Sequence, residues 1–137
     1  PAVGENVCKI VAQNLNCRTK KNFYNKRREI YRFRYMNNDQ RKKIIAMNSK
    51  YGKVICACKQ VTEGEIIDSI RRPLGARTLH GIMMRTGALS GECCGSSCVD
   101  KVAKILAKET DKGLTDILQK SEGSNIVTGR IKEFNEM

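Results

Sequence analysis

Residues 54–98 read VICACKQVTEGEIIDSIRRPLGARTLHGIMMRTGALSGECCGSSC and hold five of the seven cysteines of the 137-residue chain. Cys56 and Cys58 form a C-x-C pair, and after 34 intervening residues Cys93, Cys94 and Cys98 follow. Deprotonated thiolates are soft, polarizable ligands, and four of them suit either tetrahedral zinc or an iron-sulfur cluster. The stretch therefore predicts a metal or cluster site.

The spacing of the cysteines bears on which metal would bind. Structural zinc sites usually present each ligand pair as C-x2-4-C, with a tight turn between the two thiolates. A single residue separates Cys56 from Cys58, which is uncommon for one half of a zinc site. The spacing of Cys93 and Cys98 is compatible with either kind of site.

The same stretch resembles the 2Fe-2S domain of the bacterioferritin-associated ferredoxin family, whose pattern is C-x-C, a long intervening segment and C-x4-C. The resemblance implies a 2Fe-2S cluster with the ligands Cys56, Cys58, Cys93 and Cys98. Cys94 stands where the family has a residue that is not a ligand, so we expect it to be a small side chain in the cluster loop.

The blocks VTEGEI, RRPLGA and RTG are similar, more narrowly, to the C-terminal part of FAD-dependent glycerol-3-phosphate dehydrogenases. The opening PAVG resembles the helix that closes the FAD-binding domain of the same group. This resemblance implies that FAD is bound by a part of a larger parent flavoenzyme that this chain lacks. The implied partners are the flavin domain of the parent chain and an electron acceptor that the sequence does not identify.

Charge is distributed unevenly along the chain, which has a formal net charge of +12. Residues 1–53 hold 14 Lys/Arg and 3 Asp/Glu, a net +11, so the basic character belongs to the N-terminal part. We expect three regions: a basic arm at 1–53, formed by the end of a flavin domain and a connector; a 2Fe-2S domain at 54–110; and a C-terminal helix and tail at 111–137.

Residues 18–36 mix basic and aromatic side chains, a composition that also suits nucleic acid, with cations for phosphates and rings for stacking. We favour a connector that is anchored by its aromatic residues, because no recognised nucleic-acid motif accompanies the charge. Tyr31, Phe33 and Tyr35 alternate, which indicates strand character.

Short amphipathic segments predict a mainly α fold, a small helical 2Fe-2S domain preceded by a basic helical and extended arm. A capping box at Thr62 and Glu65 indicates a helix start, and Ser96 or Ser97 is placed to cap the helix after the cysteines. Further helices are expected at 1–16, after Asn37–Asp39, at 78–85 and near Leu114, with an extended piece at 126–127.

Several other features narrow the expected function. An odd number of cysteines, no signal-like apolar start and no apolar run near the ~18 residues of a membrane helix favour a reducing compartment, with the cytoplasm as the expectation and no transmembrane segment. Cys8 and Cys17 are expected to be packing or surface residues. His80 is the only histidine, so a Rieske-type pair is excluded, and a surface position is expected.

The expected function is one-electron transfer through the cluster in a flavin-dependent oxidoreductase, with no catalysis by this chain alone. No phosphate-binding glycine loop, paired-histidine helix or Ser/His/Asp set is present. Three alternatives remain open at this point. They are a zinc-thiolate module that binds nucleic acid, a thiol redox switch and a cluster with a purely structural role.

Two departures from the family pattern affect the redox potential. Relatives often carry basic residues between the first two cysteines and before the third, where this chain has Ala57 and Glu92. Less positive charge beside an anionic cluster favours its oxidised form. We predict that Glu92→Arg raises the midpoint potential in a redox titration, and an unchanged midpoint would contradict this interpretation.

Overall fold

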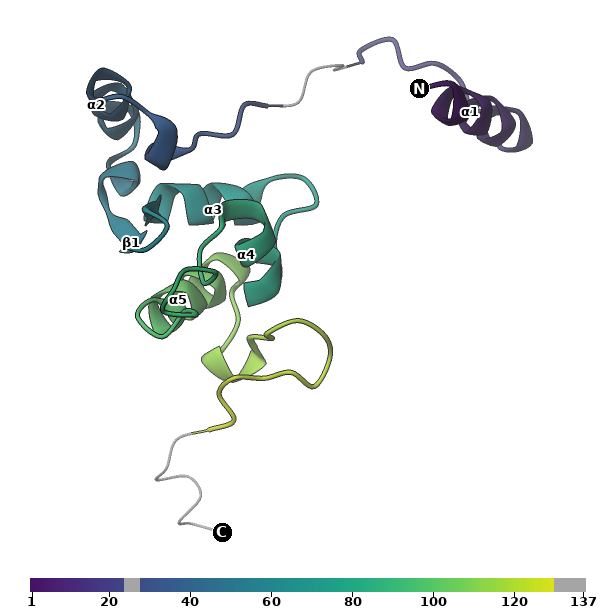
Figure 1. Ribbon diagram of the computed structural model, residues 1–137. Helices are drawn as coiled ribbons and strands as arrows, with labels where there is room; N and C mark the ends of the chain where they lie inside the picture. Colours follow the sequence, from purple (N-terminus) through teal and green to yellow (C-terminus); the bar gives the residue numbers. More distant parts are fainter. Residues whose placement is uncertain (24–27, 130–137) are drawn as a thin grey trace. The chain divides into compact units, whose positions relative to one another are not determined.

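Short helices make up most of the regular structure. The computed structural model describes residues 1–23 and 28–129. Its helices are α1 (Ala2–Asn14), α2 (Asn38–Met47), α3 (Glu63–Arg71), α4 (Leu79–Thr86) and α5 (Val99–Thr110), and its strands are β1 (Val54–Cys56) and β2 (Val61–Thr62) (Figure 1). The predicted mainly α fold class is confirmed.

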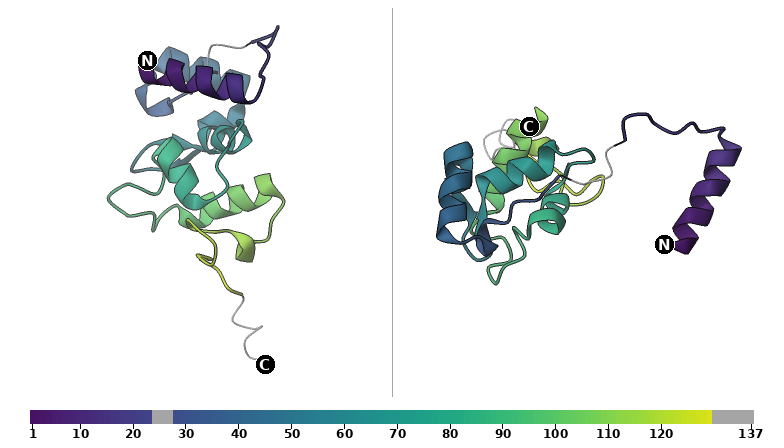
Figure 2. Two further views of the ribbon diagram at one scale, coloured as in Figure 1. Left: turned by 90° about the vertical axis from the view of Figure 1, so that its right-hand side faces the viewer. Right: turned by 90° about the horizontal axis from the view of Figure 1, so that it is seen from above.

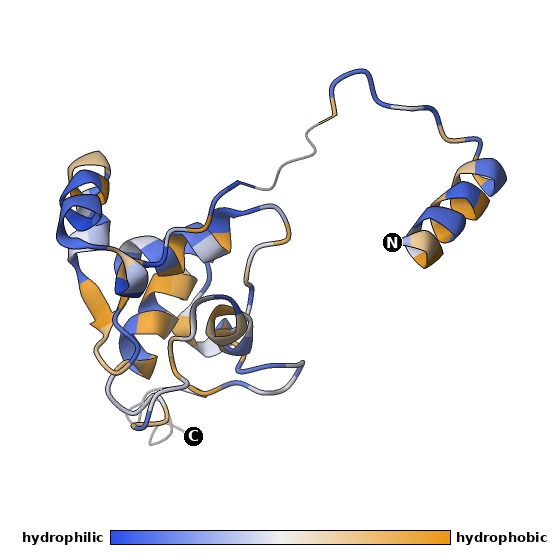
Figure 3. Ribbon diagram, turned by 45° about the horizontal axis from the view of Figure 1, so that its top comes forward, coloured by the Kyte–Doolittle hydropathy of each residue, from blue (hydrophilic) through white to orange (hydrophobic). Residues whose placement is uncertain are grey.

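The chain divides into two compact units, Pro1–Ile30 and Tyr31–Met137. The helix predicted at the start of the first unit is present as α1, which has no buried residue. The hydrophobic colouring follows one side of its ribbon (Figure 3), and its large apolar residues are all exposed; they are Val3, Val7, Ile10, Val11 and, just after the helix, Leu15. The domain boundary predicted at residue 53 stays a prediction, and the second unit begins before it, at Tyr31.

The core of the second unit lies where α3, α4 and α5 meet (Figure 2). Each helix contributes side chains that are at most 1% exposed; they are Ile66, Ile70, Leu79, Ile82, Val102 and Leu106. Full burial of one such side chain stabilises the fold by about 1.5–3 kcal/mol. This apolar cluster therefore outweighs any single polar contact on the surface.

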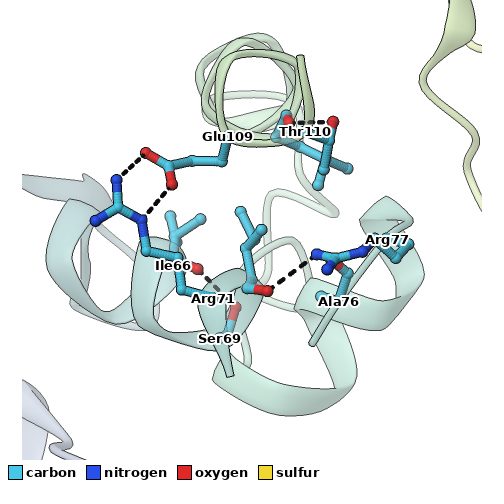
Figure 4. Close-up of polar contacts among 9 residues, drawn as sticks. Ile66, Ser69, Arg71, Ala76, Arg77, Glu109 and Thr110 are labelled. Carbon is cyan, nitrogen blue, oxygen red and sulfur yellow. Dashed lines mark hydrogen bonds and ion pairs between the residues drawn. The ribbon is translucent and has the colours of Figure 1, made fainter. Parts of the chain in front are cut away.

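An ion pair joins the ends of α3 and α5. The Arg71 guanidinium donates to both carboxylate oxygens of Glu109, with 3.1 Å between Nη2 and Oε1 (Figure 4). The Arg71 side chain is 64% exposed, and exposed pairs usually contribute about 0–1 kcal/mol. The contact therefore adds little to the packing that already joins the two helices.

The start of α3 is held by the capping box that the sequence predicted at Thr62 and Glu65. The Thr62 backbone N–H and Oγ1 donate to Glu65 Oε2 over 2.8 and 2.9 Å. The other carboxylate oxygen accepts from the Phe33 N–H over 3.3 Å. One buried carboxylate thus caps a helix and also anchors a segment 32 residues earlier in the chain.

Residues 31–53 pack against the start of α3. The Tyr51 ring lies so close to Gly64 that a Cβ there would be 2.5 Å from the ring. Tyr31 meets Tyr51 edge to face, with 6.1 Å between ring centroids. The strand character predicted at residues 31–35 is wrong, because Phe33–Tyr35 form a 3-10 turn whose first N–H is taken by Glu65.

Other local predictions have mixed outcomes. The helix after Asn37 is present with Asn37 as its cap, whereas neither Ser96 nor Ser97 caps α5, because Cys98 itself occupies that position. The short helix near Leu114 is a 3-10 turn, Leu114–Asp116. The extended piece predicted at 126–127 is wrong, because these residues form no strand; the nearest pairing is an isolated bridge between Leu118 and Asn125.

Within residues 1–23 and 28–129, no helix is both long enough and apolar enough to span a bilayer.

Loss of the Glu65 carboxylate should destabilise the second unit measurably. Glu65→Ala removes a buried acceptor of three hydrogen bonds, and we expect the free energy of unfolding to fall by about 2–3 kcal/mol. Glu63→Ala is the matched control, since it removes only the ion pair with Lys53, whose side chain is 69% exposed, and should cost under about 1 kcal/mol. Equal losses in urea unfolding of the two variants would contradict the role given to Glu65.

Candidate metal centre

A hairpin turn presents the first pair of cysteines. Strands β1 and β2 run antiparallel, with Val54 opposite Thr62 and Cys56 opposite Val61. The turn between them is closed by a hydrogen bond from the Gln60 N–H to the Ala57 carbonyl over 3.2 Å. Cys56 in the strand is 1% exposed, whereas Cys58 in the turn is exposed to solvent.

The second group of cysteines lies on a series of tight turns that leads into α5. The Cys94 N–H donates to Gly91, that of Ser96 to Cys93 and that of Cys98 to Gly95, over 2.8, 2.9 and 3.0 Å. This coiling turns the loop so that Cys98 is 1% exposed while Cys93 is only half-buried. Among the predicted ligands, each loop thus carries one buried and one more accessible cysteine.

The two loops meet at Cys58 and Cys93, whose sulfur atoms are 3.5 Å apart. The approach depends on Gly91, which is itself buried. A Cβ at this position would lie 2.4 Å from the Cβ of Cys58 and 3.3 Å from its sulfur. Real Cβ atoms do not come so close to backbone-fixed neighbours, so the contact requires glycine.

Backbone donors surround the sulfur of Cys93. Its pKa is lowered to about 7, mainly by a hydrogen bond from the Ser97 backbone, then by the Cys58 thiol and by the Gly95 backbone. Amides that point at sulfur stabilise the thiolate form, which is the form that binds metal. The loop is therefore already arranged for an anionic sulfur.

Cys98 has the opposite environment. The pKa of its thiol is raised to about 11, mainly by burial and then by the neighbouring Cys56 through its charge and a hydrogen bond. The Leu89 backbone acts in the other direction by donating to Cys98. The buried Cys98 thiol therefore loses its proton with difficulty, and a bound cation would supply the missing stabilisation.

The predicted ligands therefore come together as two pairs, Cys58 with Cys93 and Cys56 with Cys98. In the described part of the chain, no three His, Cys, Asp or Glu side chains gather around one point as a ligand set for a single ion. A 2Fe-2S cluster has two irons, each with two protein ligands. Sulfur ligands arranged by pairs fit such a cluster, and the assignment of these four cysteines as its ligands remains a prediction.

The other cysteines and His80 are not members of these pairs. Cys94 is exposed, and its backbone is in the left-handed region with φ 47°. His80 is half-buried on α4, and its backbone N–H donates to Gln119. Cys8 and Cys17 are exposed in the first unit, which agrees with the surface position expected for them.

Sequence reasoning missed Gly91 and the amide donors of Leu89 and Ser97. The Gly- and Ser-rich composition of residues 87–97 was the available signal. It indicates close approach of a backbone to a ligand, but does not say which residue makes which contact.

Comparison with known proteins supports the resemblance seen in the sequence. Residues 54–108 match the family described as BFD-like [2Fe-2S] binding domain. This match confirms the predicted resemblance and supports a 2Fe-2S cluster as the cofactor of this part of the chain. No solved structure matches.

Two relatives carry informative names. The chain is 39% identical over 113 residues to a glycerol 3-phosphate dehydrogenase of Caloramator mitchellensis, which is 82% of this chain and 24% of that protein. It is 36% identical over 59 residues to hydrogen cyanide synthase subunit HcnB of Pseudomonas aeruginosa, which is 43% of this chain and 12% of that protein. The chain therefore spans about a quarter of the first relative and still less of the second.

A side chain at position 91 should prevent the two loops from meeting. In Gly91→Ala the new methyl group overlaps Cys58, and we expect iron content after anaerobic purification to fall by more than half. Gly52→Ala is the control, because a Cβ there makes only ordinary contacts of 3.5–3.7 Å with Ile45. Full iron content in Gly91→Ala would show that the contact is not needed for the site.

Proposed function

We propose that this chain transfers single electrons through a 2Fe-2S cluster held by Cys56, Cys58, Cys93 and Cys98, as part of a flavin-dependent oxidoreductase resembling glycerol-3-phosphate dehydrogenase. The observation that carries the proposal is the arrangement of four thiols in two pairs within a segment that matches BFD-like [2Fe-2S] binding domains. When bound, the cluster supplies a carrier that takes up and releases one electron at a time.

The residues of the chain have separate tasks in this function. Cys56 and Cys98 would hold the buried side of the cluster in the core of the second unit. Cys58 and Cys93 would hold the side that is open to solvent, where a redox partner can approach. The amides of Gly95 and Ser97 stabilise the charge on the Cys93 sulfur, and such second-layer hydrogen bonds tune the potential of a metal site.

The partners follow from the relatives. The similarity to a glycerol 3-phosphate dehydrogenase supports a flavin domain, with FAD, in the parent protein, outside the segment present here. That flavin is the proposed electron donor, and the acceptor is a one-electron carrier that meets the exposed side of the site. None of the seven cysteines forms a disulfide, which suits a reducing compartment such as the cytoplasm.

Metal analysis together with a visible spectrum tests the proposal. Protein purified without oxygen should contain about two irons and two acid-labile sulfides per chain and should lose its colour with dithionite. About one zinc and no sulfide would contradict the proposal and favour the zinc module. A coloured protein that dithionite does not bleach would instead indicate a structural cluster.

Single serine variants test the ligand assignment. Cys56→Ser, Cys58→Ser, Cys93→Ser and Cys98→Ser should each lose most of the iron and shift the visible spectrum, because a serine oxygen binds iron less well than a thiolate does. Cys94→Ser is the matched control, as an exposed cysteine in the same loop, and should keep both irons. If Cys94→Ser lost iron while Cys93→Ser kept it, Cys94 would be the ligand and Cys93 would not.

A further inference from the structure

A cavity of about 390 Å³ lies in the second unit and contains none of the proposed cluster ligands. Its wall is built from four parts of the chain. These are the 3-10 turn with Arg32 before it, the hairpin at Lys59 and Val61, the start of α3 at Glu65, and the second half of α4 with the loop that follows it. The volume falls in the range of about 300–1,000 Å³ that is typical of sites for small molecules.

Positive charge dominates the wall of this cavity. Arg32, Arg34, Lys59 and Arg85 line it, against the single carboxylate of Glu65, so the formal charge of the lining is +3. Helix α4 ends at the cavity, and the last carbonyls of a helix carry about half a negative charge. The lining stays positive after both contributions are counted.

The four cations are not neutralised by carboxylates of the described residues. Arg85 donates to the backbone carbonyls of Gly81 and Leu74 over 3.1 and 2.8 Å, and Arg34 lies over the Tyr35 ring at 5.8 Å. The Glu65 carboxylate is taken up by its own hydrogen bonds with Thr62 and Phe33. Converging cations with no internal counterion are suited to an anion from outside.

Apolar and aromatic groups complete the wall. Val61, Met83 and Met84 line it together with Tyr35, whose side chain is 80% exposed. Thioethers and phenol rings make favourable contacts with planar rings. The cavity therefore offers cations for an anionic group and soft, flat surfaces for an aromatic one.

We propose that this cavity binds a mononucleotide, a planar ring joined to a phosphate. The basic side chains would hold the phosphate, with Arg34 contributing directly, and Tyr35 and the methionines would contact the ring. Lys59 directly follows Cys58 in the chain, so a bound nucleotide would lie next to the hairpin turn of the metal centre. The proposal does not depend on which metal the cysteines hold.

Binding is tested on the full chain, with its metal content measured on the same sample, by calorimetric titration at physiological salt. The probes are AMP, FMN, inorganic phosphate, adenosine and riboflavin. We expect AMP or FMN to bind with a Kd below about 1 mM, and at least ~10-fold more tightly than inorganic phosphate or the matching nucleoside. The proposal would be overturned if AMP and FMN both failed to bind at ~10 mM. It would also be overturned if inorganic phosphate bound as tightly as the two mononucleotides do.

Two variants separate the site from general attraction by a basic protein. Arg34→Gln should weaken nucleotide binding about 10-fold, since a charge-assisted contact is lost. Lys42→Gln is the control, an exposed cation on α2 outside the cavity lining, and should change binding less than about twofold. Equal weakening by both variants would overturn the proposal in favour of non-specific electrostatic binding.

Tyr35→Ala tests the ring contact alone. It should weaken nucleotide binding by about fivefold or more, as loss of a stacking partner does, and leave the affinity for inorganic phosphate unchanged. An unchanged nucleotide affinity would show that Tyr35 does not contact the ring. It would then favour a simple anion over a mononucleotide as the ligand and overturn the proposal. All these outcomes are independent of the iron and sulfide content that tests electron transfer.

Discussion

The close approach of the Gly91 backbone to Cys58 is the contact on which the candidate metal centre is built. The hairpin turn and the loop before α5 are separate in sequence, and they meet where Gly91 presents a backbone surface without a side chain to Cys58. With that contact in place, the sulfurs of Cys58 and Cys93 come within 3.5 Å. The core of α3, α4 and α5 then fixes the distance between the two loops, because interiors are packed too densely to let helices slide.

Glu65 ties a second set of segments to the same framework. Its carboxylate binds the start of α3, the end of the hairpin and the 3-10 turn at Phe33. The hairpin that carries Cys56 and Cys58 is therefore braced from one side by a buried carboxylate and from the other by the loop of Gly91. The same carboxylate lines the basic cavity, so the cavity and the hairpin share one rigid wall.

Periodicity and capping signals in the sequence predicted most of the helices, because these are local properties. The box of Thr62 and Glu65 is an example, since three residues of spacing contain the whole interaction. The strand expected at Tyr31, Phe33 and Tyr35 failed because a residue 32 positions away takes the backbone donor of Phe33. Ser96 or Ser97 was expected to cap α5 with its side chain, whereas Cys98 holds the cap position and the Ser97 backbone donates to the sulfur of Cys93.

The sequence predicts the candidate site as a set of residue types and spacings, but not the pairing of its members. Which cysteine lies beside which depends on how two loops fold over the core, and no local pattern contains that information. The basic cavity could be predicted from the sequence even less than the cysteine pairs. Its cations come from residues 32, 34, 59 and 85, which in the sequence merge with a basic arm and ordinary surface charge.

The separation of Cys58 and Cys93 by 35 positions has a consequence for the life of the protein in the cell. A metal group that bridges them closes a long loop, and on the scale used for disulfides such a closure restricts the unfolded chain by about 4 kcal/mol. That is a large share of the stability of a small domain. Iron supply would then set the folded fraction, so that chains made during iron shortage are degraded sooner than chains made when iron is plentiful.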